Sequence, residues 1–86
     1  MPLQGEPGLP VRYTDHARRQ MRRRQIPPEA VEMVLQAYHT SRPAPYREGA
    51  KPAVIYTGEF AGRHLKVYVE RDSNPFLVTT AVWEGD

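Results

Sequence analysis

The chain of 86 residues contains no cysteine. This absence excludes disulfide bonds, thiol catalysis and zinc sites that use thiolate ligands. Long hydrophobic runs are also missing, because no stretch approaches the roughly 18 apolar residues that a membrane-spanning helix needs. Residues 1–10 have neither the charged segment nor the apolar segment of a secretory signal. We therefore expect a cytoplasmic protein that does not associate with membranes.

The common metal-binding and cofactor-binding motifs are absent as well. The three histidines, His16, His39 and His64, lie too far apart in sequence to form an H-x-H or H-E-x-x-H motif. Neither of the glycine-rich motifs that cradle phosphates occurs. We therefore expect no metal and no cofactor, so any chemistry must come from the side chains of the chain itself.

The length of the chain suits one domain with a small core. A domain of this size buries only about 60–65% of the surface that its unfolded chain exposes. Residues 1–10 contain three prolines and two glycines, a composition typical of a loose segment. We predict a flexible N-terminal arm over residues 1–10 and a single α+β domain over residues 11–86.

Two helices are predicted in the first half of the domain. The first begins after Thr14, a good N-cap residue, and must end before Ile26 because two prolines follow. The second begins at this proline pair and runs to about Tyr38. Its apolar residues recur at the spacing of one helix face: Val31, Val34, Leu35 and Tyr38.

Three strands are predicted in the second half. Residues 53–60, 63–71 and 76–83 are rich in β-branched and aromatic side chains and are separated by short turns. The loop over residues 39–52 is long, and part of it near Tyr46 is expected to pair as an edge strand. The predicted fold is therefore two N-terminal helices packed on one face of a three- to four-stranded, mostly antiparallel sheet.

The turn lengths also predict which side chains share a face of this sheet. One face is apolar and should carry the helices: Val54, Tyr56, Gly58, Leu65, Val67, Val69, Val78, Thr80 and Val82. The other face is more polar: Ile55, Thr57, Glu59, His64, Lys66, Tyr68, Glu70, Leu77, Thr79, Ala81 and Trp83.

The polar face carries the groups that RNA cleavage without a metal requires. A histidine beside a carboxylate, here His64 and Glu59, can move protons, and Lys66 can stabilise a charged phosphorane. Tyr68 and Trp83 could stack against bases. The alternative is an ordinary solvated face, which every antiparallel sheet with one buried side presents.

The first predicted helix is rich in arginine. Residues 12–24 contain six arginines and one acidic residue. Such a stripe is typical of a surface that binds polyanions, although a solvated helix face is the alternative. His16 shares a helix face with Arg19 and Arg23, whereas Arg24 lies between this face and the buried one. For His16, a structural role and an acid–base role both stay open.

Several segments resemble a family of short bacterial domains of unknown function. The helical segment YTDHARRQMRRRQIPPEAVEMVL is similar to the family motif Y-T-x-H-A-x-x-R-M-x-x-R-x-I, and the strands VIYTGEFAGRHLKVYVE and LVTTAVW also match. The resemblance covers residues 11–84. It departs at Gln20, where members have a charged residue, and at Gln25, where glycine is common. The matching positions are His16, Arg24, Ile26, Lys66 and Thr79 or Thr80.

This family is similar in architecture to RelE- and BrnT-like toxins, which are small ribonucleases of toxin–antitoxin pairs. The resemblance implies a metal-independent endoribonuclease that acts on RNA and pairs with an acidic, antitoxin-like protein. The candidate catalytic residues are His64, His16, Lys66, Arg24, Tyr68 and Thr79, and the candidate nucleic-acid-binding residues are Arg19, Arg23 and Trp83. The alternative is a non-catalytic module that binds an acidic protein partner or structured RNA.

Overall fold

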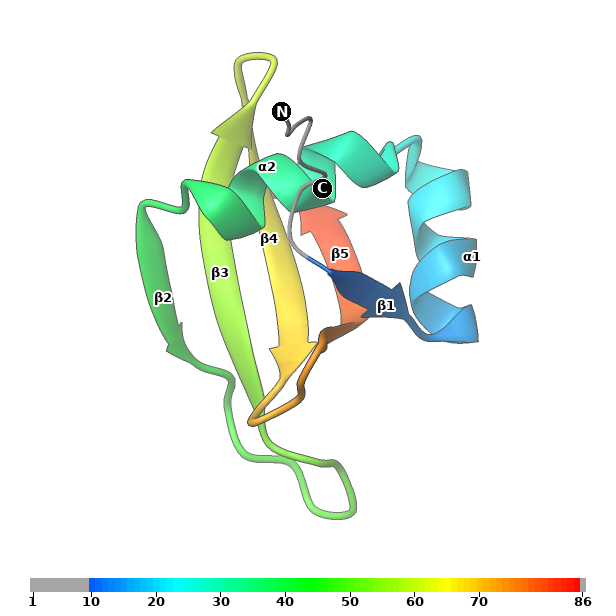
Figure 1. The fold of residues 1–86 in the computed structure, drawn as a ribbon, viewed down its shortest axis with the longest axis vertical. Coiled ribbons are helices and arrows are strands. Elements are labelled where there is room, and N and C mark those ends of the chain that lie inside the picture. The colour runs from blue at the N-terminus through cyan, green and yellow to red at the C-terminus, as the bar shows by residue number, and fades with distance from the viewer. Residues whose placement is uncertain (1–9, 86) are drawn as a thin grey trace.

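A five-stranded sheet and two helices make up the described part of the chain, residues 10–85 of a computed structural model (Figure 1). The elements follow in the order β1 (Val11–Tyr13), α1 (Asp15–Arg24), α2 (Pro28–Gln36), β2 (Thr40–Pro43), β3 (Ala53–Phe60), β4 (Arg63–Glu70) and β5 (Phe76–Trp83). The strand order in the sheet is β1-β5-β4-β3-β2. The α+β class and the two helices are confirmed, whereas residues 1–9 of the predicted arm lie outside the described residues.

The sheet has more strands than predicted, and it is mixed. β1 pairs with β5 in parallel, with Val11 opposite Phe76. β2 pairs with β3 in antiparallel fashion, and it begins at Thr40 instead of lying near Tyr46, which is 86% exposed in the following loop. Strands of three or four residues carry too little alternation to be recognised in a sequence.

The residues at the ends of the helices explain where each helix begins and where α1 ends. The hydroxyl of Thr14 accepts a hydrogen bond of 3.0 Å from the backbone N–H of Ala17, as expected of an N-cap. Gln25 ends α1 in the left-handed conformation, with φ of 56°, which explains why glycine suits this position. α2 begins with Pro28, which already has the φ that a helix needs. Neither helix in residues 10–85 is long and apolar enough to cross a membrane.

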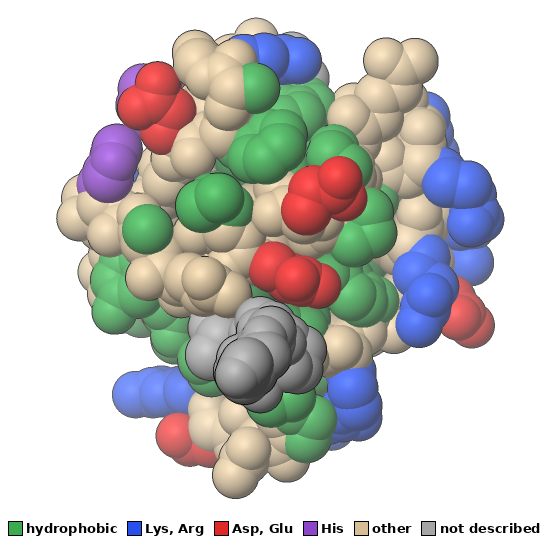
Figure 2. All heavy atoms as spheres, turned by 45° about the horizontal axis from the view of Figure 1, so that its top comes forward, with side chains coloured by type: hydrophobic (Ala, Val, Ile, Leu, Met, Phe, Trp, Pro, Cys, Tyr) green, Lys and Arg blue, Asp and Glu red, His purple; other side chains and the backbone are tan. Residues whose placement is uncertain are grey.

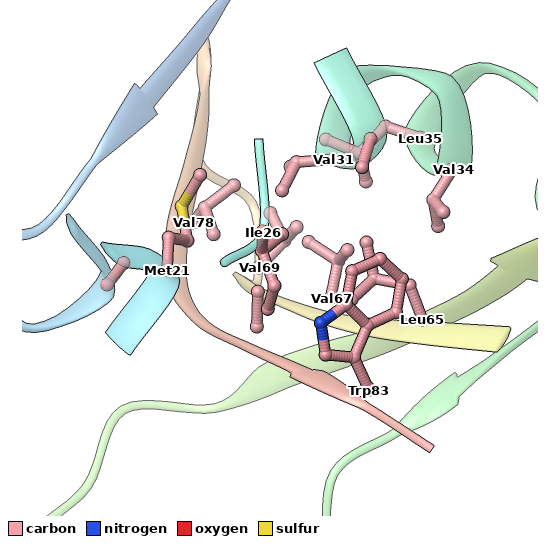
Figure 3. Close-up of a cluster of buried hydrophobic side chains, with 13 residues drawn as sticks. Met21, Ile26, Val31, Val34, Leu35, Leu65, Val67, Val69, Val78 and Trp83 are labelled. Atoms are coloured by element: carbon pink, nitrogen blue, oxygen red, sulfur yellow. The ribbon is translucent and has the colours of Figure 1, made fainter. Parts of the chain in front are cut away.

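Both helices contribute to one hydrophobic core on one side of the sheet (Figure 3). α2 packs on β3 and β4, whereas α1 packs along β5 and β1. Gly58 in β3 permits the close approach of α2, because an added Cβ would lie 3.3 Å from both methyl groups of Val34. The largest fully buried side chains are Leu65, Val31, Val34, Val67 and Val78.

The register of the β3–β4 hairpin agrees with the prediction. Phe60 pairs with Arg63, and the pairing continues without a break to the far end of β3. The two turn residues, Ala61 and Gly62, both have positive φ values, of 53° and 81°. Positive values at both positions are typical of the type I′ turn, which matches the twist of the two strands.

A β-bulge changes the predicted register between β4 and β5. Val69 pairs with Val78 as predicted, but Tyr68 pairs with Thr80, so Thr79 is an extra residue in β5. After the bulge the register of β5 is shifted by one residue, so each following side chain of this strand lies on the face opposite to the predicted one. Ala81 and Trp83 consequently point into the core, at 0% and 5% exposure, and the prediction that they lie on the polar face is wrong.

The side of the sheet that faces away from the helices is called the open face below. Thr80 and Val82 belong to it, contrary to prediction, because the bulge inverts the end of β5. The open face consists of Thr40, Arg42, Ile55, Thr57, Glu59, His64, Lys66, Tyr68, Glu70, Leu77, Thr80 and Val82.

The outer edge of β5 is closed by α1 beyond the three residues that pair with β1. The Arg24 guanidinium donates a hydrogen bond of 2.8 Å to the backbone carbonyl of Ala81. In return, the Trp83 indole donates a hydrogen bond of 2.9 Å to the backbone carbonyl of Arg24. The C-terminal end of α1 thus supplies a partner for the Ala81 carbonyl, one of the backbone groups that a neighbouring strand would otherwise pair.

Replacing Leu35 by alanine tests the packing of α2. Leu35 is 4% exposed, so Leu35→Ala should lower the free energy of unfolding by about 2–5 kcal/mol through lost burial and a residual cavity. Gln36→Ala, on the exposed side of the same helix, should change it by no more than about 0.5 kcal/mol. Urea denaturation measures both, and equal effects would contradict the observed packing.

Replacing Arg24 by methionine tests the closure of the β5 edge. Arg24→Met keeps the length of the side chain but removes the donor to Ala81, so the free energy of unfolding should fall by about 1.5–3 kcal/mol, the range for bonds to charged groups. Arg23→Met is the control, because Arg23 is exposed and should change stability by about 0.5 kcal/mol at most. Indistinguishable denaturation curves for the two variants would show that the edge does not depend on Arg24.

Candidate active site

Three chemically active side chains form a row along β4 on the open face. His64, Lys66 and Tyr68 occupy alternate positions of the strand, so they point to the same side. Successive members of the row are about 6.6 Å apart, at roughly 3.3 Å per residue. His64 is exposed, whereas Lys66 and Tyr68 are half-buried. The structure therefore brings these three predicted site residues together.

A second histidine lies beside His64 at the β3–β4 turn. The rings of His39 and His64 have centroids 6.1 Å apart and are inclined by 72°. The backbone N–H of His39 donates a hydrogen bond of 2.7 Å to the carbonyl of Thr57, which fixes His39 next to β3. Glu59 is the cross-strand partner of His64. Two imidazoles and a carboxylate thus form a set of proton donors and acceptors at this end of the row.

Sequence reasoning did not select His39 as a site residue. Its position depends on β2, the short strand that begins at the next residue, and this strand has no periodic signal. The histidine pair and Glu59 do not form a metal-binding group, and no cluster of three or more potential ligands occurs within residues 10–85.

A groove of about 540 Å³ opens at the other end of the row. The loop between β2 and β3 forms one wall, and the C-terminal part of β4 and the middle of β5 form the floor. The floor residues are Tyr68, Thr79 and Thr80, and the cationic residues that line the groove are Arg47, Lys51 and Arg71. Tyr68 therefore belongs both to the row and to the groove, which makes the two features one continuous surface.

The groove combines positive charge with a flat aromatic ring. Guanidinium groups bind phosphate in a bidentate manner, and a tyrosine ring can stack against a base. Lys51 lies 4.0 Å from Glu70, but its side chain is 80% exposed, so this ion pair is weak and leaves the lysine accessible. The hydroxyl of Thr79, the bulge residue, donates a hydrogen bond of 3.4 Å to the carbonyl of Tyr68. The bulge thereby places Thr79 at the groove beside Tyr68.

Trp83 does not lie on the open face. The bulge turns its indole into the core, where it packs with Leu65 and Val67 (Figure 3). The guanidinium of Arg63 lies 4.3 Å from the centroid of the indole ring. The expectation that Trp83 offers a stacking surface beside Tyr68 is therefore wrong in its geometry.

His16 is remote from His64. His16 is in the first turn of α1, two residues after Thr14, whose backbone N–H donates to the carbonyl of Val78. His64 is at the opposite end of β5, because its carbonyl accepts a hydrogen bond from Glu84. Six residues of extended chain separate Val78 from Glu84, or about 20 Å. The two histidines therefore cannot serve one reacting group together.

The arginines of α1 divide into structural and exposed groups. Arg24 is half-buried, and its guanidinium donates to Ala81, so this candidate site residue is engaged at the edge of β5. Arg19 and Arg23 are exposed, and neither forms an ion pair with a carboxylate of residues 10–85. Figure 2 shows basic side chains gathered along the side of the molecule where α1 lies. Arg19 and Arg23 therefore add accessible positive charge to this side.

Comparison with protein families identifies the chain. The model of the family DUF4258, described as a domain of unknown function, matches residues 13–83. The matched range runs from Tyr13 in β1 to Trp83 in β5, and so includes both helices, the row on β4 and the groove. No curated protein and no solved structure matches the chain. The chain therefore belongs to the DUF4258 family of domains of unknown function.

Proposed function

We propose that this domain is a RelE/BrnT-like toxin-type endoribonuclease that cleaves RNA on its open face without a metal ion. One observation carries the proposal: the row of His64, Lys66 and Tyr68 connects a pair of histidines to a cationic groove. Proton-transferring groups at one end and a phosphate-binding groove at the other are the two parts that such an enzyme needs.

The row sets the path of the RNA. A nucleotide enters the groove, where its base stacks on Tyr68 and its phosphate meets Arg47 and Arg71. The chain then follows β4, whose open-face side chains are spaced by about 6.6–6.8 Å, close to one step of an extended single strand. Lys66 binds the next phosphate, which is the one that is cleaved, and His64 reaches the 2′-hydroxyl beside it.

The cleavage step needs only the side chains of this end of the row. His64 takes the proton of a 2′-hydroxyl, and the oxygen attacks the adjacent phosphorus to form a new P–O bond. Lys66 stabilises the negative charge of the phosphorane. The bond to the 5′-oxygen then breaks, and His39 donates the proton to this leaving oxygen. The products are a 2′,3′-cyclic phosphate and a 5′-hydroxyl, so atoms and charges balance.

The exposed arginines of α1 assist the approach of RNA. Arg19 and Arg23 add positive charge outside the groove, and such charge raises the rate at which polyanions associate. Arg24 and His16 take no part in the proposed step, because Arg24 closes the edge of β5 and His16 lies at the far end of that strand.

The histidine and the lysine of the row can be tested by RNA cleavage in the presence of a chelator. The purified protein should cut single-stranded RNA and leave 2′,3′-cyclic phosphate ends. His64→Ala and Lys66→Ala should each lower the rate by about 10²-fold or more, the usual scale for acid–base and charge-stabilising groups. Gln36→Ala, on the exposed side of α2, is the control and should not change the rate. Activity that disappears with the chelator, or that persists in a His64/Lys66 double variant, would refute the mechanism.

The groove can be tested separately through the salt dependence of binding. A non-cleavable 2′-O-methyl RNA should bind with an affinity that falls linearly with salt on logarithmic axes. Arg47→Ala and Arg71→Ala should each reduce this slope by about 0.7, the value for one lost contact with a single strand. Arg22→Ala removes the same charge from α1, away from the groove, and should leave the slope unchanged. Fluorescence anisotropy measures all three, and identical slopes would exclude the groove as the phosphate-binding site.

A further inference from the structure

A second hollow lies on the helix side of the molecule, where β1, α1 and the start of α2 meet. Its volume is about 200 Å³, and it is lined by Tyr13, Arg18, Met21, Arg22, Ile26 and Pro28. Figure 2 shows hydrophobic side chains reaching the surface here, between two acidic side chains and the basic side chains on the side of α1. The hollow therefore has an apolar floor and a cationic rim.

The cationic rim consists of Arg18 and Arg22, which are one helical turn apart on the same flank of α1. Both side chains are exposed, and no carboxylate of residues 10–85 pairs with either. The guanidinium of Arg18 lies 5.7 Å from the centroid of the Tyr13 ring. None of the acidic residues within residues 10–85 lines the hollow. Its charge is therefore complementary to a carboxylate.

The hydroxyl of Tyr13 gives a second, independent indication of a ligand. Its oxygen atom is buried, although the residue as a whole is only partly buried, and like Oε1 of Gln20 it has no hydrogen-bond partner in the described structure. Buried hydroxyl groups are normally paired, so an unpaired one calls for an explanation. Burial, and to a lesser extent the charge of Glu32, raises the pKa of Tyr13, whereas Arg18 lowers it. The phenol therefore remains protonated at neutral pH and is a donor that lacks an acceptor.

We propose that this hollow docks a segment of an acidic partner protein. An apolar side chain of the segment fills the hollow against Met21 and Ile26, and an acidic side chain beside it binds Arg18 and Arg22. A volume of about 200 Å³ suits one hydrophobic side chain, and buried anchors surrounded by charged pairs are typical of protein interfaces. Glu32 repels carboxylates on the α2 side, so the acidic side chain of the segment lies toward α1.

This docking site does not depend on the proposed ribonuclease activity. The hollow opens on the helix side, whereas the row and the groove are on the open face. A partner bound in the hollow and an RNA bound on the open face can therefore occupy the domain together, and each can be tested without the other.

A synthetic peptide with one leucine flanked by glutamates is a suitable probe. Addition of the peptide to ¹⁵N-labelled protein should shift the amide signals of Tyr13, Arg18 and Arg22 in a saturable manner. The double variant Arg18→Glu/Arg22→Glu should lower the affinity by about tenfold or more, as expected when charge pairs at an interface are lost. The matched control, Arg19→Glu/Arg23→Glu, changes the net charge of the same helix equally and should have a much smaller effect.

One variant of the peptide and one of the protein test the apolar contact in the hollow and the polar contact of Tyr13 separately. A peptide with serine in place of leucine should bind more weakly, because nothing fills the floor of the hollow. Tyr13→Phe should weaken peptide binding without lowering the stability of the free protein, since the hydroxyl that it removes has no partner there.

Three results would overturn the docking site. A peptide with lysines in place of the glutamates could bind equally well, the largest shifts could map to the groove, or 2′-O-methyl RNA could displace the peptide. The charge reversal at Arg18 and Arg22 should leave the cleavage rate at saturating RNA unchanged, because both residues lie away from the open face, so failure of the docking site and failure of the nuclease are distinguishable.

Discussion

The reciprocal hydrogen bonds between Arg24 and the end of β5 fix the C-terminal end of α1 against the outer edge of this strand. β1 covers only the first three residues of β5, so the rest of that edge would expose unpaired backbone groups. Arg24 satisfies the Ala81 carbonyl, and Trp83 satisfies a carbonyl at the end of α1. The same helix places Ala17 and Met21 in the core, so these bonds and the apolar contacts together position α1. An arginine that the sequence offers as a catalytic group is therefore a structural one.

Much of the fold was predictable because its signals are local. The two-residue turn sets the register of β3 and β4, and the spacing of Val31, Val34 and Leu35 defines the buried side of α2. The bulge was not predictable, because Thr79 and Thr80 read equally well on either face. Burial of the large indole of Trp83 in place of Val82 favours the bulged register, and this preference is evident only once α1 is in position.

The residues of the candidate site were likewise predictable only where local sequence signals determine their positions. The row on β4 was predicted because alternation within a hairpin fixes its direction, so His64 and Lys66 were placed correctly on the open face. His39 and the cations of the groove were missed. Their positions depend on a four-residue edge strand and on the path of a proline-rich loop, neither of which has a periodic pattern. His16 was selected for its neighbours in sequence, but β5 separates it from the row.

The extra threonine in β5 makes this strand tolerant of substitution at that position and of the loss of that one residue. Exchange of Thr79 for another β-branched residue would keep the bulge, since the backbone hydrogen bonds on both sides define it. Deletion of that single residue would join the two halves of β5 in one continuous register with Tyr68 still opposite Thr80, so Ala81 and Trp83 would continue to point into the core. Members of the family that lack this residue should therefore keep apolar side chains at the positions equivalent to Ala81 and Trp83, a pattern that sequence alignment can reveal.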